Sequence, residues 1–288
     1  MKTAYFWLTP QGKQLAEQLQ AHFGGMVEPK ADFAEAVRRA FADCDALVFV
    51  MATGIVVRTI APLVQSKASD PAVLVLDQRG KHVISLLSGH LGGANAMAEQ
   101  AAAYLGGEAV ITTATDVEHV PAFDLFAKEN HLTIENLEEL KYISGALVAG
   151  EPVSLCTAFP VEKNAFPETV QIQPFSETPR HACAVAIADT TESVAAPHVL
   201  YLRPKSLVLG VGCKKQIPPA HLEQCFRTFL QEHHLSLSAV EKLATIGLKR
   251  EEPAILALCE KYRLPLEIVA DADIQACLLY TSPSPRDR

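Results

Sequence analysis

The residues best suited to chemistry lie in a glycine loop at positions 88–95, Ser-Gly-His-Leu-Gly-Gly-Ala-Asn. His90 lies inside this loop, and an imidazole that titrates near neutral pH can both take and give protons. Backbone N–H groups of such a loop and of a following helical turn lack intrahelical partners, so they can bind an anionic oxygen. Taken alone, the loop is better explained as a tight turn whose glycines serve only packing.

The elements around the loop must position it. A Val-, Ile- and Leu-rich run at residues 83–87 predicts a buried strand before the loop. Residues 96–105 predict a helix after it, with Met97, Ala101 and Tyr104 as the buried stripe. The expected unit is therefore strand, glycine loop, helix.

Composition limits the class of protein. The chain has 288 residues, 49% of them hydrophobic and 20% charged, which is typical of a globular protein with a large core. No apolar run approaches the roughly 18 residues of a membrane span, and the N-terminus has no signal-peptide pattern. The seven cysteines form no CxxC pair, which favours reduced thiols in the cytoplasm and disfavours a zinc site. A net charge of −8 disfavours general nucleic-acid binding but allows an anionic small molecule.

The order of apolar runs predicts an α/β protein with three domains. Residues 1–126 alternate strands and helices, which indicates a mostly parallel, layered α/β domain. Residues 127–205 predict a small middle domain that links the other two. Residues 206–276 repeat the pattern of strand, glycine loop (Gly210 to Cys213) and helix, which predicts a C-terminal α/β domain. Residues 277–288 look like a translated sequencing adaptor, so we expect this last domain to be truncated.

Four loops of the first domain collect its polar side chains, at 52–54, 67–71, 88–90 and 112–116. Ligands of open α/β sheets bind at the carboxyl ends of strands, so the three loops that follow strands are expected to share one crevice. The loop at 67–71 precedes its strand and is expected at the other edge. Each of these residues has an ordinary explanation when taken singly. Arg58 and Lys67 suit an exposed surface, Asp70 suits a turn, and Asp116 suits a helix cap. Their clustering favours a functional site.

These loops together resemble one family. Gly-Ile-Val-Val-Arg (54–58), Lys-Ala-Ser-Asp-Pro-Ala-Val (67–73), the loop at 88–95 and Ile-Thr-Thr-Ala-Thr-Asp (111–116) occur in order and at close spacing. The combination is similar to the cobalt-precorrin-5A hydrolases of the anaerobic route to cobalamin. Gly-Val-Gly-Cys-Lys-Lys (210–215) and Leu-Lys-Arg-Glu-Glu-Pro (248–253) resemble the start of that family's C-terminal domain. The likeness is dense in the first domain and loose in the middle one.

The resemblance implies a hydrolase that acts on a ring-contracted cobalt tetrapyrrole. Water opens the δ-lactone formed by the ring A acetate, and the bridging two-carbon fragment leaves as acetaldehyde. The cobalt arrives inside the substrate, so we expect no cofactor and no metal held by protein ligands alone. Consistent with this expectation, His82, His90 and His119 lack any recognised metal spacing. A homo-oligomer is compatible with the sequence.

The resemblance also suggests roles for individual residues. The amides from Gly89 to Gly93 could stabilise the oxyanion of lactone opening. His90 is the first candidate for the base that takes a hydroxyl proton, with Asp70 or Asp116 orienting it or acting in its place. The predicted substrate-binding residues are Thr53, Gly54, Arg58, Lys67, Ser88, Gly89, Gly92, Gly93, Asn95, Thr112, Thr113, Gly210, Gly212, Lys214 and Lys215.

Two other functions fit parts of the sequence. A non-catalytic corrinoid carrier would use the same loops only to hold anionic side chains, and would bind without releasing acetaldehyde. An ordinary phosphate- or nucleotide-binding α/β protein is disfavoured, because the P-loop pattern is missing and Gly210-x-Gly212 lacks the third glycine of the dinucleotide fingerprint.

Overall fold

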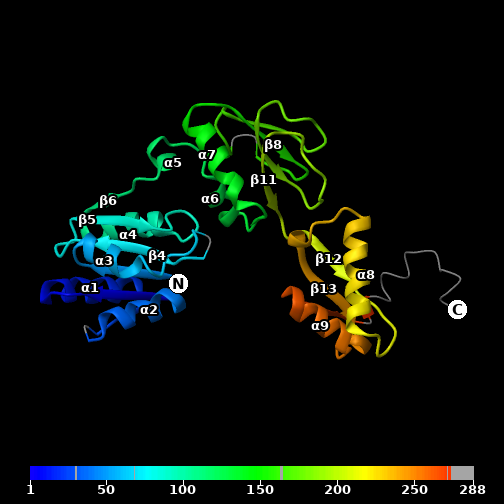
Figure 1. The fold of residues 1–288 in the computed structure, drawn as a ribbon, viewed down its shortest axis with the longest axis horizontal. Coiled ribbons are helices and arrows are strands. Elements are labelled where there is room, and N and C mark those ends of the chain that lie inside the picture. Colours follow the sequence, from blue (N-terminus) through cyan, green and yellow to red (C-terminus); the bar gives the residue numbers. More distant parts are fainter. Residues whose placement is uncertain (30, 68, 163–164, 271, 274–288) are drawn as a thin grey trace, which may run out of the picture. The chain divides into compact units, whose positions relative to one another are not determined.

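The computed structural model describes residues 1–29, 31–67, 69–162, 165–270 and 272–273. The chain divides into two compact units, Met1–Phe126 and Ala127–Arg288 (Figure 1). The α/β class predicted from the sequence is confirmed. The predicted adaptor-derived tail at 277–288 lies outside the described residues, and the three-domain division stays a prediction. Within the described part of the chain, no helix has the length and apolar character needed to cross a membrane.

The first unit is a six-stranded sheet in the order β2-β1-β3-β4-β5-β6. Every neighbouring pair is parallel except β4 and β5, which are antiparallel. Its elements are β1 (Thr3–Trp7), α1 (Pro10–Phe23), β2 (Met26–Val27), α2 (Phe33–Asp43), β3 (Ala46–Val50), α3 (Thr53–Ile60), β4 (Ala72–Leu76), β5 (His82–Leu87), α4 (Ala94–Leu105), β6 (Glu108–Val110), α5 (Ala114–Val117) and α6 (Phe123–Glu129).

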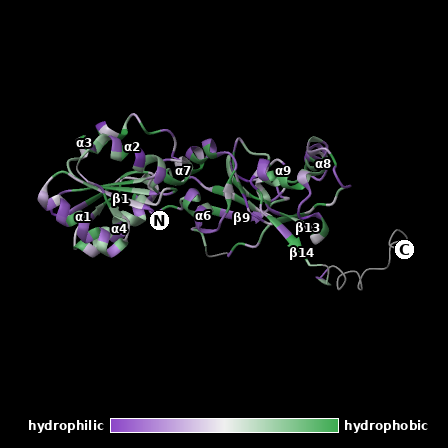
Figure 2. Cartoon of the chain, turned by 90° about the horizontal axis from the view of Figure 1, so that it is seen from below, coloured by the Kyte–Doolittle hydropathy of each residue, from purple (hydrophilic) through white to green (hydrophobic). Residues whose placement is uncertain are grey.

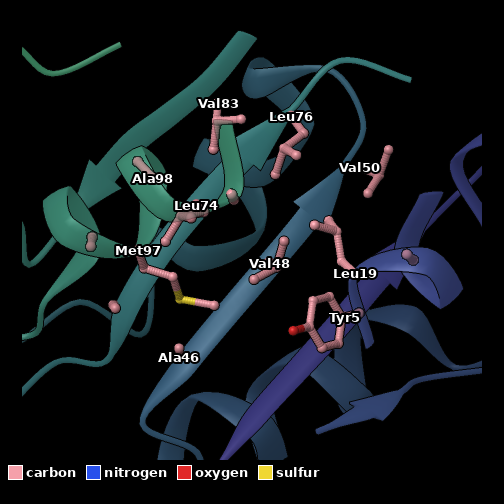
Figure 3. Close-up of a cluster of buried hydrophobic side chains, with 14 of the residues drawn as sticks. Tyr5, Leu19, Ala46, Val48, Val50, Leu74, Leu76, Val83, Met97 and Ala98 are labelled. Atoms are coloured by element: carbon pink, nitrogen blue, oxygen red, sulfur yellow. The ribbon is translucent and has the colours of Figure 1, made fainter. Parts of the chain in front are cut away.

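Helices cover both faces of this sheet. Apolar residues of α1 and α4 pack on one face, where Leu19, Met97 and Ala98 contact a layer that includes Val48 and Leu74 (Figure 3). Residues of α2 and α3 pack on the other face. The strands β3 and β4 are therefore buried on both sides, which explains why their sequences are continuous apolar runs. The hydropathy colouring in Figure 2 shows the same arrangement, with apolar strands inside helices that carry hydrophilic outer surfaces.

One detail of α4 differs from the sequence prediction. Met97 and Ala101 are buried as expected, but Tyr104 is 39% exposed. Its ring stacks on that of His22, with centroids 3.9 Å apart. The third position of the predicted stripe therefore lies beyond the core, where an aromatic ring covers the end of α1.

The antiparallel β4–β5 hairpin sets the position of every loop that could form a site. Leu76 pairs with Val83 next to the turn, and Val73 pairs with Leu87 at the other end. The carboxyl end of β5 therefore lies beside the amino end of β4. Because β6 is parallel to β5, its carboxyl end lies at this same edge. The carboxyl ends of β3 and β4 lie at the opposite edge.

The second unit contains two sheets, with orders β7-β11-β10-β8-β9 and β12-β13-β14. All pairs are parallel except β7 with β11. Apolar residues of α8 and α9 join those of β13 in one core. The elements are β7 (Thr133–Ile134), a 3-10 turn (Leu137–Glu139), α7 (Leu140–Val148), β8 (Val153–Thr157), β9 (Val170–Pro174), β10 (Cys183–Ile187), β11 (His198–Arg203), β12 (Leu207–Gly210), α8 (Pro219–Glu232), 3-10 turns at Leu237–Ala239 and Gly247–Lys249, β13 (Val240–Ile246), α9 (Pro253–Tyr262) and β14 (Leu266–Val269).

Candidate functional site

The candidate site lies at the edge of the first sheet where β5 and β6 end. The glycine loop leaves β5 through Ser88, whose φ of 56° is in the left-handed region that non-glycine residues rarely adopt. A Cβ on Gly92 would lie 2.4 Å from the Cβ of Ser88, and one on Gly89 would lie 2.7 Å from the side-chain oxygen of Asn95. Packing therefore requires glycine at both positions. Without side chains there, the loop can turn tightly and hold His90 against the edge of the sheet.

Within this loop, His90 lies between two carboxylates. Its Nε2 is 2.7 Å from Oδ2 of Asp116, in α5, and its Nδ1 is 3.1 Å from Oδ1 of Asp124, in α6. The side chains of His90 and Asp124 are 9% and 11% exposed, whereas that of Asp116 is 35% exposed. Asp116 is therefore the member of the cluster that a substrate can reach.

Asn95, in the first turn of α4, fixes the position of Asp116. Its Nδ2 donates to Oδ2 of Asp116 at 3.0 Å and to Oγ1 of Thr113 at 3.2 Å. The hydroxyl of Ser85 donates to Oδ1 of Asn95 at 2.6 Å, which sets the orientation of the amide. Both fixed bonds of Asp116 go to Oδ2, and among the described residues no hydrogen bond reaches Oδ1. That oxygen is the one free to meet a substrate proton.

The surroundings of His90 favour its charged form. The hydrogen bond to Asp124 is the largest cause of a raised His90 pKa; burial opposes it, and Asp116 adds to the rise. Burial acts to raise the pKa of Asp124, but hydrogen bonding and attraction from His90, followed by the Leu125 amide and Lys67, hold it below its ordinary value. Such a cluster keeps an imidazolium between two carboxylates.

This state changes the role expected of His90. A protonated ring whose two nitrogens both contact carboxylates cannot itself accept a substrate proton. Asp116, which is partly exposed, is better placed as the base, and His90 as the group that holds a positive charge behind it. Asp124 anchors the other side of the ring.

Comparison with known proteins places the chain in a family. Its residues 35–116 match the profile described as Cobalamin synthesis G N-terminal, residues 121–204 match Cobalamin biosynthesis central region, and residues 207–288 match Cobalamin synthesis G C-terminus. The chain is 34% identical over 284 residues to a Cobalt-precorrin-5A hydrolase from Salmonella typhimurium, covering 92% of this chain and 80% of that protein. The chain belongs to the cobalt-precorrin-5A hydrolase family.

Two further proteins named for cobalamin biosynthesis or for this hydrolase are similar to the chain. The Cobalt-precorrin-5A hydrolase of Priestia megaterium is 35% identical over 77% of this chain and 63% of its own length. A solved structure of a cobalamin biosynthesis protein G homolog from Sulfolobus solfataricus is 21% identical, with a TM-score of 0.46 over 100% of this chain and 86% of that one. The profile matches and the named hydrolase relatives confirm the family resemblance stated from the sequence.

In this family member, the loop that was expected at the far edge joins the site. The hydroxyl of Ser88 donates to the backbone oxygen of Asp70 at 2.9 Å. The carboxylate of Asp70 is not directed at His90, because it accepts hydrogen bonds from the amides of Gln65 and Ser66 at 3.0 and 3.1 Å. The geometry therefore gives Asp70 a role in holding its own loop and no support for the catalytic role predicted for it. Lys67 remains exposed nearby.

The prediction that the loop at 52–54 shares the crevice of His90 is wrong. Thr53 and Gly54 begin α3 at the carboxyl end of β3, on the opposite edge of the sheet, and Arg58 lies one turn further on. Thr53 instead lines a cavity of about 530 Å³ together with residues such as Thr9 and Asp77. The antiparallel hairpin, which reverses the direction of β5, is the physical reason for this separation.

The oxyanion site predicted for the loop amides is also smaller than expected. Three backbone amides of the loop donate to backbone carbonyl oxygens of the same loop. These hydrogen bonds run from Gly93 to His90 at 3.1 Å, from Ala94 to Ser88 at 3.2 Å and from Asn95 to Gly89 at 3.0 Å. These donors are therefore used inside the turn. Of the segment from Gly89 to Gly93, the amide of Gly93 is excluded as an oxyanion donor, and the amides of Gly89, His90 and Gly92 remain candidates.

The remaining predicted residues divide between the two units. Thr113 belongs to the network through Asn95, whereas Thr112 is exposed beside it. The other four lie in the second unit: Gly210 ends β12, and Gly212, Lys214 and Lys215 follow it. Among the described residues, no group of three or more His, Cys, Asp or Glu side chains is arranged to hold a metal ion.

Asp124 is the functional residue that the sequence reasoning missed. It stands in an apolar segment, with Phe123 before it and Leu125 and Phe126 after it. An acid in the first turn of a helix is usually explained by the helix dipole. The hydrogen bond that Asp124 Oδ1 accepts from the Leu125 amide fits that explanation. The available signal was its position among residues that must be buried, since a buried carboxylate needs a partner.

Proposed function

We propose that this chain hydrolyses cobalt-precorrin-5A, opening its δ-lactone with water and releasing acetaldehyde. Family membership supports the reaction, and the half-exposed Asp116 carboxylate backed by His90 is the single structural observation that carries the mechanism. Lactone hydrolysis adds water to the carbonyl carbon and breaks the acyl–oxygen bond. This leaves a carboxylate and a free hydroxyl on the bridging carbon, and one proton passes to the solvent.

Asp116 acts in the second stage of the reaction. Its Oδ1 takes the proton of that hydroxyl, the oxygen's electron pair forms the aldehyde carbonyl, and the bond to the macrocycle breaks. The electron pair of that bond goes to the ring carbon, which takes the proton from Asp116. One water is consumed, and the proton returns to product, so Asp116 ends ionised as it began.

His90 and Asp124 position and tune this carboxylate. The His90 ring holds Oδ2 of Asp116, while Asn95 holds the same oxygen from a second direction. Asp124 in turn stabilises the charge on His90. His90 is the positively charged group that contacts both carboxylates of the cluster.

The experiment that tests the proposal is an anaerobic incubation of the protein with cobalt-precorrin-5A, with acetaldehyde measured by a coupled alcohol dehydrogenase. The hydrolase proposal expects one acetaldehyde for each substrate consumed. The alternative, a corrinoid carrier, expects the substrate to bind without acetaldehyde release. A melting-temperature shift with nucleotide and none with corrinoid would favour a nucleotide-binding protein instead.

Partners and location follow from the same proposal. The cobalt belongs to the substrate, so we expect the protein to need no cofactor of its own. We expect no nucleic-acid partner, in keeping with the net charge of −8. We place the protein in the cytoplasm, because the six described cysteines are all free, as thiols are in a reducing compartment. Assembly into a homo-oligomer stays a prediction that the mass in solution would test.

A further inference from the structure

Three glycines of the second unit have no role in holding the fold. Gly210 ends β12, Gly212 follows it, and Gly247 follows β13. None of them has a positive φ, and a Cβ on any of them would meet no atom within 4 Å. They differ in this from Gly89 and Gly92, which packing requires. Glycine in a strand without such a reason is typical of a place where a ligand approaches the backbone.

Two of these glycines line a hollow of about 490 Å³ at the carboxyl ends of β12, β13 and β14. The three strands are parallel, so their carboxyl ends share one edge, which is where open α/β sheets bind ligands. The floor is held firmly, because the amide of Val211 donates to Ala244 at 2.8 Å and the hydroxyl of Thr245 donates to Val211 at 2.7 Å. Its volume is within the range of small-molecule sites.

The walls of this hollow are apolar. Val211, Ile246 and Val269 line it with the glycines. Ile246 is 39% exposed, and Leu248, in the turn after β13, is 88% exposed. A hollow with glycines in its floor and aliphatic side chains on its walls suits the face of a large planar ring, which would cover this apolar area.

The rim carries positive charge. Lys214, Lys215 and Arg250 are exposed, and within the described ranges none of them forms an ion pair. Lys249, which lines the hollow, is held by Glu252 at 3.3 Å, and Glu252 also accepts from the Gln216 amide at 2.8 Å. The exposed acid on this segment is Glu251. Three free cations on a chain of net charge −8 give the rim a local charge opposite to that of the whole.

We propose that this hollow in the second unit binds the face of the tetrapyrrole macrocycle, with the rim cations holding its peripheral carboxylates. The inference rests on the proposed function, because that function supplies a flat, anionic substrate. It adds a binding site in a unit that contains none of the His90 cluster.

Equilibrium dialysis with two cobalt corrins tests the site. The probes are cobyrinic acid, whose side chains end in carboxylates, and its methyl ester, which has the same ring without those charges. Wild-type protein is expected to bind the acid more tightly than the ester. Gly210→Leu or Gly212→Leu should fill the floor and weaken both probes by about tenfold or more, a loss of about 1.4 kcal/mol. A double variant, Lys214→Gln with Lys215→Gln, should weaken the acid and leave the ester unchanged.

Gly145→Leu is the matched control. Gly145 is an exposed glycine of α7 whose Cβ would also meet no atom within 4 Å, but it lies outside the hollow. Its variant should bind both corrins like wild type. Corrin binding that is unchanged in the glycine variants, with unchanged melting temperatures, would overturn the site, as would wild-type protein that binds neither corrin. The lysine variant tests the site even if a glycine variant fails to fold.

Turnover separates this inference from the proposed function. If the wild type binds cobyrinic acid through the hollow but releases no acetaldehyde from cobalt-precorrin-5A, the hydrolase proposal fails and the binding site stands. If acetaldehyde is released and the glycine variants keep the wild-type KM, the hydrolase proposal stands and the binding site is wrong. Support for both requires a raised KM in Gly210→Leu and a wild-type KM in Gly145→Leu.

Discussion

His90 Nε2 and Asp116 Oδ2 are 2.7 Å apart, and of these two side chains only that of Asp116 is substantially exposed. The pair therefore has a buried side, which Asp124 stabilises, and an open side, which a substrate can contact. In the proposed mechanism, the buried side sets the charge on His90, and the partly exposed Asp116 carboxylate is the group that transfers the proton.

Replacing the outer carboxylate should remove the proton-transfer group. We expect Asp116→Asn to lower kcat by about 10² to 10⁴-fold, with a smaller change in KM, because an amide cannot take the hydroxyl proton. The assay is anaerobic acetaldehyde release under saturating substrate. Asp43→Asn, at the exposed end of α2, is the matched control and should keep the wild-type rate. A wild-type rate in Asp116→Asn would show that another group takes the proton.

Asp124→Asn should change the pH dependence of the reaction. Asp124 raises the pKa of His90, so its loss lowers that pKa and the ring loses its charge at a lower pH. Because the mechanism needs the charged ring, the alkaline limb of the kcat profile should move to lower pH. The measurement is kcat against pH for both proteins. An unchanged alkaline limb with reduced kcat throughout would assign Asp124 a purely structural role.

Stability should follow the charge on His90. The folded-state pKa of His90 is raised above its ordinary value of 6.5, so the cluster's contribution is fully present below that value and is lost as the pH rises through the raised pKa. The stability difference between wild type and His90→Gln should therefore shrink as the pH increases above 6.5. Urea unfolding followed by Trp7, the single tryptophan and part of β1, reports on this unit. A difference that grows with pH would contradict the assignment.

Packing at the glycine loop gives a separate prediction. Gly92→Ala should destabilise the first unit by about 1–3 kcal/mol, because the new methyl group would overlap Ser88. Gly145→Ala provides the contrast in the other unit: its site is open and helical, so a gain of about 0.5–1 kcal/mol is expected. Urea midpoints from Trp7 fluorescence for the first variant and from circular dichroism for the second test both. Equal, small effects would show that the loop can relax around a side chain.

Much of the first unit could be predicted from sequence because local rules decide it. The apolar runs at β3 and β4 indicate strands buried on both faces, and the structure places them in the centre of the sheet. The residues Gln-Arg-Gly-Lys at 78–81 are typical of a hairpin turn, but strands alternating with helices suggest parallel neighbours throughout. One reversed strand moved Thr53 away from His90 and brought the Asp70 loop beside it.

The site itself was only partly predictable. His90 and Asp116 could be selected because titratable residues in loops at strand ends are suited to chemistry. Asp124 could not, since its partner depends on where α6 packs, and this is a tertiary contact that no local pattern encodes. The raised pKa of His90 was also beyond sequence reasoning, because it depends on contacts with two carboxylates. With one carboxylate alone, the ring would have remained a candidate base.

The most direct test of the account is single-turnover acetaldehyde release by His90→Gln, measured anaerobically with enzyme in excess over cobalt-precorrin-5A. His22→Gln, an exposed histidine at the end of α1, serves as the control. The account predicts a rate at least about 100-fold below wild type in His90→Gln, with the substrate still bound, and a wild-type rate in the control. Wild-type release by His90→Gln would contradict the claim that the Asp124–His90–Asp116 cluster carries out the reaction.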